Sequence, residues 1–290
     1  MMADWNSADI QVVNDYRAQL GETPVWCARS QSLLWVDILQ QRLLRYWPES
    51  SGRTEIHAMP PFTSAVLLTG KEEVFLTVSQ NGIALYDYAH QRFEPLCDYP
   101  TDTADTRPNE AAIAPDGALW FSTMDPAVSQ AIGSWYRFAW GDVAPRRLLG
   151  GLLVPNTLQW HDGHVWFADS LRHSFYCTPA ADTTLSSLTT HPVDGIPDGS
   201  ALTTSGQLIN ARWGQSRLVR CQLSGPHMRE LDALPLPVRQ PSSCTFGGPD
   251  LSTLFITSAR DGLSQPGATD GALLCTATRL TGQPAGQFVY

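Results

Sequence analysis

Acidic, amide and guanidinium side chains recur at one place in a series of sequence repeats. Glu22 stands in LGETPVW, Asn156 in VPNTLQW and Asp198 in IPDGSAL, while Arg107 and Asn109 share TRPNEAAI. Two carboxylates and one amide oxygen form an all-oxygen donor set that suits Ca²⁺, Mg²⁺ or Mn²⁺ and is tolerable for Zn²⁺. Three protein ligands leave room for water and substrate, as a catalytic metal requires. We therefore expect Glu22, Asn156 and Asp198 to bind one divalent cation.

The elements that must position these residues are built around six short apolar triplets. The triplet centres lie at 35, 76, 120, 166, 209 and 255, and successive centres are 41 to 46 residues apart. A period of roughly 40–50 residues with four short strands is typical of a β-propeller blade. A jelly roll or sandwich would not produce six copies at one spacing. We predict an all-β fold: one six-bladed β-propeller domain over residues 1–290, with four-stranded antiparallel blades around a central channel.

Equivalent positions in a ring of blades converge on its axis, so the polar residues are expected to face one mouth of the channel. The same position holds Thr63–Ser64 in the second blade and Ser243–Cys244 in the sixth. Asp198 and Asn156 are also compatible with simple Asx turns. Glu22 is a poor turn residue and Arg107 has no role in a turn, so the set as a whole favours a site.

Composition narrows the classes of partner. The formal net charge of −9 argues against nucleic acid and anionic membranes. The N-terminus has no basic region followed by an apolar one, and no apolar stretch approaches the ~20 residues of a membrane span. Six cysteines without CxxC spacing indicate free thiols in a reducing compartment. We expect a cytoplasmic protein in which residues of about 10–20 help to close the ring against the last blade.

Other groups of residues give weaker indications of a functional site. His161 and His164 flank the Asp162–Gly163 turn, so we interpret them as turn residues and not as a metal pair. The chain has no G-x-S-x-G motif, which a serine-hydrolase elbow would need, and no phosphate-binding glycine loop.

The motifs together resemble the regucalcin/senescence-marker/gluconolactonase family. The resemblance is carried by LGETPVW, RPN, the Met-Asp pair at 124–125, VPNTLQW, PDGSAL and the segment at 236–259, and it covers about residues 12–290. It implies a six-bladed propeller with one divalent metal at the channel mouth and hydrolysis of sugar lactones. By resemblance Glu22, Asn156 and Asp198 correspond to the metal ligands, and Arg107 and Asn109 to the substrate-binding pair.

The chain also departs from the family pattern. Asn109-Glu110-Ala111 stands where the family usually has Asn-Asp-Gly, and Asn156-Thr157 stands where Asn-Gly is frequent. Asp125-Pro126-Ala127 replaces a segment that carries a substrate-contacting Glu in some relatives, and Asn210 replaces an apolar residue. These differences bear on the substrate more than on the reaction.

The expected mechanism is hydrolysis of a sugar (aldono) lactone with the cation acting as Lewis acid and activating water. Asp198 doubles as general base, and Arg107 and Asn109 orient the sugar. Glu110 and Asp125 are secondary candidates for hydroxyl contacts. The alternatives are a calcium-binding regulatory propeller, a propeller that binds a protein partner without catalysis, and a relative of propeller hydrolases that act on aryl esters. The sequence leaves open which lactone is used, which metal is physiological and which oligomer forms.

Overall fold

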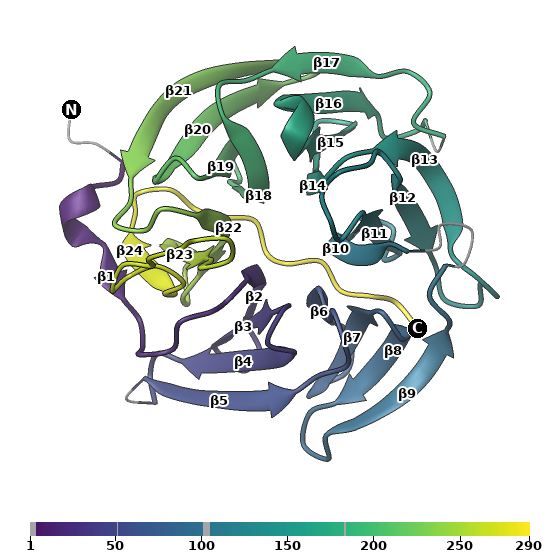
Figure 1. Ribbon diagram of the computed structural model, residues 1–290, viewed down its shortest axis with the longest axis horizontal. Coiled ribbons are helices and arrows are strands. Elements are labelled where there is room, and N and C mark those ends of the chain that lie inside the picture. Colours follow the sequence, from purple (N-terminus) through teal and green to yellow (C-terminus); the bar gives the residue numbers. More distant parts are fainter. Residues whose placement is uncertain (1–3, 51, 101–104, 183) are drawn as a thin grey trace.

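The computed structural model describes residues 4–50, 52–100, 105–182 and 184–290. Six four-stranded antiparallel sheets stand around a central axis, as predicted (Figure 1). Each of the first five sheets is formed by four strands in sequence order, from the innermost strand outward. The sixth has the order β22–β23–β24–β1, so the N-terminal strand is its outer edge.

The blades are therefore numbered one to six along the chain. Their strands are β2(Gly21–Cys27), β3(Ser32–Asp37), β4(Arg42–Trp47) and β5(Arg53–Ala58); β6(Ala65–Leu68), β7(Val74–Ser79), β8(Gly82–Asp87) and β9(Arg92–Cys97); β10(Arg107–Ile113), β11(Leu119–Met124), β12(Gly133–Phe138) and β13(Arg146–Leu152); β14(Pro155–His161), β15(His164–Asp169), β16(Ser174–Pro179) and β17(Thr189–Pro192); β18(Ile196–Leu202), β19(Gln207–Trp213), β20(Arg217–Ser224) and β21(His227–Pro235); β22(Pro241–Gly247), β23(Thr253–Ser258), β24(Leu274–Ala277) and β1(Gln11–Val12). The helical segments of the described chain are two single 3₁₀ turns, η1(Ser7–Asp9) and η2(Ser170–Arg172). None of the described helices is long and apolar enough to cross a membrane.

The apolar triplets lie in the second strand of each blade. These strands are covered on both faces by the neighbouring blades, and β3 and β11 are buried over their whole length. A strand buried on both faces has a continuous apolar run instead of an alternating one. Some outer strands, such as β17, are largely exposed and accordingly polar.

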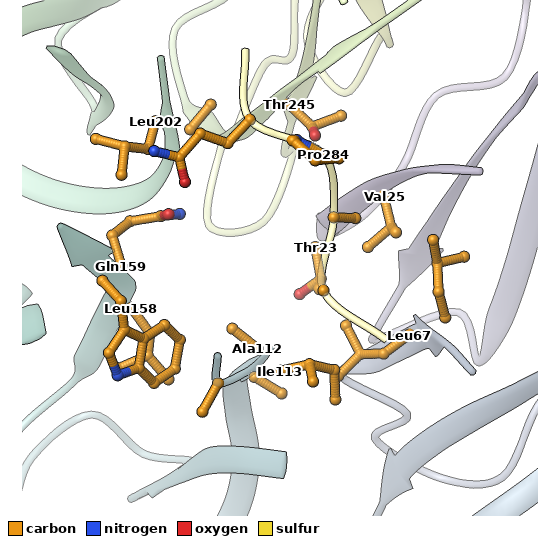
Figure 2. Close-up of a pocket in the computed structure, with 18 of the residues that line it drawn as sticks. Thr23, Val25, Leu67, Ala112, Ile113, Leu158, Gln159, Leu202, Thr245 and Pro284 are labelled. Carbon is orange, nitrogen blue, oxygen red and sulfur yellow. The ribbon is translucent and has the colours of Figure 1, made fainter. Parts of the chain in front are cut away.

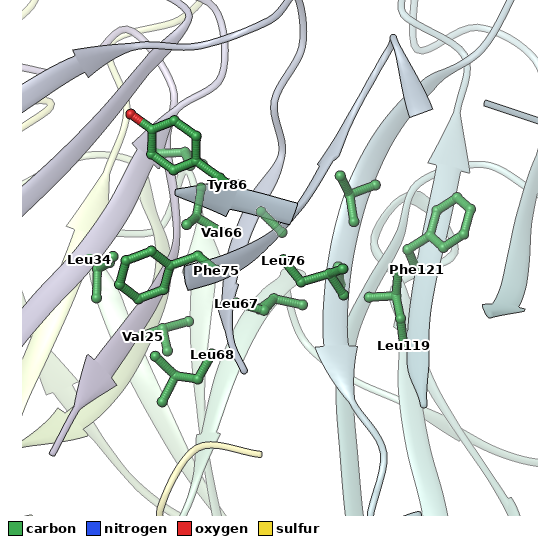
Figure 3. Packing of buried hydrophobic residues seen from close by; sticks show 14 of the residues in the cluster. Val25, Leu34, Val66, Leu67, Leu68, Phe75, Leu76, Tyr86, Leu119 and Phe121 are labelled. Atoms are coloured by element: carbon green, nitrogen blue, oxygen red, sulfur yellow. The ribbon is translucent and has the colours of Figure 1, made fainter. Parts of the chain in front are cut away.

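Apolar side chains between adjacent blades form the core. The largest cluster joins the first three blades, where Phe75 and Leu76 of β7 lie between residues of β3 and β11 (Figure 3). The tryptophans at triplet centres, Trp35, Trp120 and Trp166, are buried. All six cysteines are free, and four of them are buried.

Two segments join the ends of the chain to the ring. β1 pairs with β24 through Gln11–Cys275 and Val12–Leu274. The C-terminal segment 281–290 then crosses the axis of the ring (Figure 1). Its Gln283 N–H donates to the carbonyl of Leu202 and its Phe288 N–H to the carbonyl of Leu68, each 2.9 Å away. Leu202 and Leu68 are the last residues of β18 and β6, so the segment lies across the far ends of the inner strands.

A cavity of about 480 Å³ occupies the channel above this segment. Its wall combines the inner strands with the C-terminal segment, and the side chain of Gln159 points into it (Figure 2). Glu110, which follows Asn109 on β10, and Thr23, which follows Glu22 on β2, line it as well. The C-terminal segment thus borders the channel at the end opposite the predicted site.

Candidate active site at the channel mouth

The predicted residues lie where the inner strands begin, and hydrogen bonds link these beginnings around the ring. Thr23 Oγ1 of blade one donates to the carbonyl of Ser64 in blade two, 2.8 Å away. Asn109 Nδ2 of blade three donates to Asn156 Oδ1 of blade four at 3.0 Å. Thr157 Oγ1 continues from blade four to the carbonyl of Asp198 in blade five. The structure therefore places the predicted residues around one mouth of the channel.

A β-bulge accompanies each predicted metal ligand: it follows Glu22 and Asn156, and it contains Asp198. The pairing register shifts between Glu22 and Val25, between Asn156 and Leu158, and between Pro197 and Ser200. A bulge re-aims the side chains beside it, and bulges are frequent next to active sites. In blades one and four the bulge contains a threonine with positive φ, 44° at Thr23 and 46° at Thr157. Such a conformation is unfavourable for a β-branched residue, and strain of this kind concentrates at functional sites.

Thr157 explains one departure from the family pattern. It takes the left-handed conformation that glycine adopts without cost. Its hydroxyl is bonded to the carbonyl of Asp198 and lies 2.7 Å from Ser200 Oγ. The two side-chain contacts to blade five therefore compensate for a backbone conformation that is unfavourable for threonine.

The amide of Asn156 is fixed at both ends. Its Nδ2 donates to Ser170 Oγ at 2.9 Å, while its Oδ1 accepts from Asn109 Nδ2. Ser170 Oγ in turn donates to the carbonyl of Pro197 at 2.6 Å, next to Asp198. Because a carbonyl oxygen has two lone pairs, Oδ1 of Asn156 retains one for a further partner.

Three carboxyl groups share the interior of the site. Burial and repulsion from Glu110 raise the pKa of Glu22 to about 8, although the Thr23 N–H and Arg107 oppose the shift. Burial raises the pKa of Glu110 to about 7. The pKa of Asp198 is also raised well above its usual range, by burial and then by Glu22 and Glu110. Acids that repel one another in a dry site are stabilised by a bound cation.

Arg107 is the cationic group of the site. Its guanidinium is buried and donates to Asn109 Oδ1 at 3.1 Å and to the carbonyl of Pro108 at 3.0 Å. Burial lowers its pKa, while Glu22 and Asp198 are among the acids that oppose this shift. Its N–H groups and the oxygens of Asn109 are suited to hold the hydroxyls of a sugar.

Glu110 and Asp125 lie differently. Glu110 borders the channel cavity, and its Oε1 accepts from the Ala111 N–H at 3.0 Å. Asp125 is buried directly after β11 and accepts hydrogen bonds from Ala127, Ser129 and Gln130 within its own turn. These bonds lower the pKa of Asp125 to about 2. The role of both residues as hydroxyl contacts stays a prediction.

The donor set fits a hard divalent cation. Glu22 and Asp198 supply carboxylates and Asn156 an oriented amide oxygen, all of them buried. Oxygen donors with two negative charges are what Ca²⁺, Mg²⁺ and Mn²⁺ prefer. Within the described residues no three His, Cys, Asp or Glu side chains form a metal-binding group, so the candidate set depends on its amide member.

The structure adds residues that the sequence analysis did not assign to the site. Asn210 is fully buried, and its Nδ2 donates to the carbonyl of Asp198 at 2.7 Å and to Ser200 Oγ at 2.9 Å. Ser170 is the second such residue. Asn210 stood out as a polar residue in an apolar strand, which was the available signal. Ser170 lies 14 residues from its partner Asn156 along the chain, so only the fold reveals its role.

In blade six the structure corrects which residue occupies the position equivalent to Asn156. Pro241 pairs with Ser258 as Pro155 pairs with Asp169, so the equivalent of Asn156 is Ser242. The sequence had placed Ser243–Cys244 there, because the bulge adds a residue that spacing does not reveal.

Comparison with known proteins agrees with this architecture. The family described as SMP-30/Gluconolactonase/LRE-like region matches residues 20–260. The chain belongs to this family, and the resemblance deduced from its motifs is confirmed. It is 31% identical to an L-arabinolactonase of Azospirillum brasilense over 94% of this chain and 93% of that protein. It is 30% identical to a 6-deoxy-6-sulfogluconolactonase of Pseudomonas putida over 88% of each chain.

A solved structure extends the likeness. A calcium-binding protein, regucalcin, from Agrobacterium tumefaciens superposes with a TM-score of 0.88 at 25% identity, over 99% of each chain. Lactonases open cyclic esters, so the relatives support a carboxylic ester hydrolase, which agrees with the predicted hydrolysis of a lactone.

Proposed function

We propose that the chain hydrolyses a sugar (aldono) lactone to the sugar acid, with one divalent cation held by Glu22, Asn156 and Asp198. The observation that carries the proposal is the meeting of three repelling carboxyls and one arginine at the channel mouth, in a member of a lactonase-containing family. When bound, the cation supplies a Lewis acid for the lactone carbonyl and makes a neighbouring water more acidic.

The side chains of the site supply proton transfer and orientation of the substrate. Asp198 takes a proton from the attacking water as general base. The bond between the carbonyl carbon and the ring oxygen breaks, and the ring oxygen takes up a proton. Arg107 and Asn109 orient the sugar through its oxygens, which keeps the carbonyl within reach of the water. Each turnover releases one proton, because the product acid ionises at neutral pH.

Proton release from C5 and C6 aldonolactones, followed with a pH indicator against the uncatalysed rate, tests the proposal. A chelator is expected to abolish the enzymatic rate, and Ca²⁺, Mn²⁺, Mg²⁺ or Zn²⁺ to restore it. Asp198→Asn is expected to lose about 100-fold or more, as for loss of a general base. Asp250→Asn is the control, since Asp250 is exposed and bonded only within its own loop to Ser252. Full activity of Asp198→Asn or Asn156→Ala would contradict the site.

A calcium-binding regulator is the second candidate, because the Agrobacterium structure is described as a calcium-binding protein. Lactone turnover distinguishes the lactonase from the calcium-binding regulator. Stoichiometric Ca²⁺ binding without turnover of any lactone in the panel would favour the regulator.

A further inference from the structure

Two buried aspartates hold the backbone that leads into the site. Asp37 ends β3 and Asp169 ends β15, and neither side chain is exposed. Asp37 accepts the N–H groups of Gln19 at 2.8 Å and Leu20 at 3.1 Å. Asp169 accepts those of Leu153 and Val154, both at 3.0 Å. Each carboxylate therefore bridges two consecutive N–H groups of the loop before an inner strand.

The two arrangements have the same register. The bonded N–H groups belong to the residues three and two positions before Glu22 in blade one, and three and two positions before Asn156 in blade four. Asp37 pairs with Gly21 and Asp169 with Pro155, which are the residues immediately before those candidate ligands. The two blades lie on opposite sides of the ring (Figure 1). In blade six a carboxylate also accepts the N–H three positions before Ser242, from Arg239 to Asp270, so the contact to both N–H groups is the feature that blades one and four share.

Blade five shows that the device is not common to all blades. The residue that pairs with Pro197, immediately before Asp198, is Arg212, and its guanidinium is buried without a hydrogen-bond partner. The backbone around Asp198 is held by Asn210 instead.

We propose that Asp37 and Asp169 are positioning residues, here called the anchor aspartates. They hold Glu22 and Asn156 at the same level along the channel axis, so that both can bind one cation. This inference rests on the proposed function. Charged hydrogen bonds to backbone N–H groups are stronger than neutral ones and fix geometry. Partners behind metal ligands typically change affinity 10- to 100-fold when they are mutated.

Manganese affinity tests the inference without relying on turnover. Mn²⁺ binding is measured by electron paramagnetic resonance on the purified chain, with thermal melting in parallel. Asp37→Asn and Asp169→Asn are each expected to weaken Mn²⁺ binding by about tenfold, because the new amide N–H group faces a backbone N–H group.

Asp270→Asn is the matched control. Asp270 is buried and accepts the N–H of Arg239 at 2.8 Å, three residues before Ser242, where blade six has no candidate ligand. This variant is expected to melt earlier but to bind Mn²⁺ within about twofold of the parent chain. Equal affinity losses in the control and the anchor variants, or no loss in either, would overturn the inference.

A milder variant keeps the inference testable if an anchor variant does not fold. Tyr16→Phe removes the hydroxyl that donates to Asp37 Oδ2 at 3.0 Å. It is expected to weaken Mn²⁺ binding about threefold, and unchanged affinity would count against a positioning role.

Two ligand variants separate failure of the proposed function from failure of the positioning role. If Asp198→Ala and Asn156→Ala also bind Mn²⁺ normally, the proposed function fails. If they lose Mn²⁺ while the anchor variants retain it, only the positioning role fails.

Discussion

At the scale of single residues, the buried acids are the source of pH dependence. Glu110 has a pKa of about 7 against its ordinary value of 4.5, and Glu22 has one of about 8. A carboxyl whose pKa is raised by folding stabilises the protein at low pH, and this contribution is lost as pH rises from about 4.5 to its folded pKa. In the absence of a cation, the chain should become less stable between about pH 5 and pH 8.

Glu110→Gln should remove part of this loss. With chelator present, the variant is expected to melt like the parent at pH 5 and at a higher temperature at pH 8, by the equivalent of on the order of 3 kcal/mol. Thermal melts across this range, with Asp250→Asn as control, check the result. Parallel pH curves for parent and variant would contradict the assigned cause.

At the scale of elements, the sequence predicted the strands better than their bulges. The six triplets are legible because strands such as β3 are buried on both faces and read as apolar runs. The bulges depend on the pairing register between two strands, which a single strand does not encode. Thr23 and Thr157 illustrate this limit, because a β-branched residue signals a regular strand and gives no sign of a left-handed conformation.

The candidate site could be assembled from the sequence only in part for the same reason. Glu22, Asn156, Asp198, Arg107 and Asn109 carry chemistry at repeated positions, so they could be selected from the sequence. The residues that hold them could not, because Asp169 and Ser170 act on residues 16 and 14 positions away, which only the pairing of strands within blade four brings close.

The bulge of blade five gives a prediction at this scale. Asn210→Leu, which keeps the side-chain volume, removes two donors from the bulge that presents Asp198. It is expected to cost about 1–3 kcal/mol in the free energy of unfolding and to weaken Mn²⁺ binding. Denaturant unfolding and Mn²⁺ titration measure the two effects.

Thr77→Val is the control for Asn210. Thr77 is buried in β7, and its hydroxyl donates to the carbonyl of Ala84 at 3.1 Å. Because blade two has no candidate ligand, the control should lose stability alone. Equal Mn²⁺ affinities in both variants would show that Asn210 does not support the site.

At the scale of the whole molecule, the C-terminal segment joins blades that are not neighbours. Its residues bond to Leu202 in blade five and Leu68 in blade two, and Phe288 is completely buried and stacks on Phe138. This segment supplements the two-residue pairing of β1 with β24. We interpret it as a brace across the ring.

Phe288→Ala should therefore destabilise the whole propeller. Loss of a buried phenylalanine costs about 3–5 kcal/mol, whereas the mostly exposed neighbour Val289 should tolerate alanine with little change. Denaturant unfolding of the two variants measures the difference. Equal stabilities would mean that the segment is not a brace.

The central claim is that Glu22, Asn156 and Asp198 bind one cation in common. Anomalous diffraction from crystals grown with Mn²⁺ tests this most directly, because it locates the ion independently of activity. The account predicts one strong peak at the channel mouth, within bonding distance of a carboxylate oxygen of Glu22, Oδ1 of Asn156 and a carboxylate oxygen of Asp198. A fully occupied Mn²⁺ elsewhere, with these three oxygens sharing no ion, would contradict it.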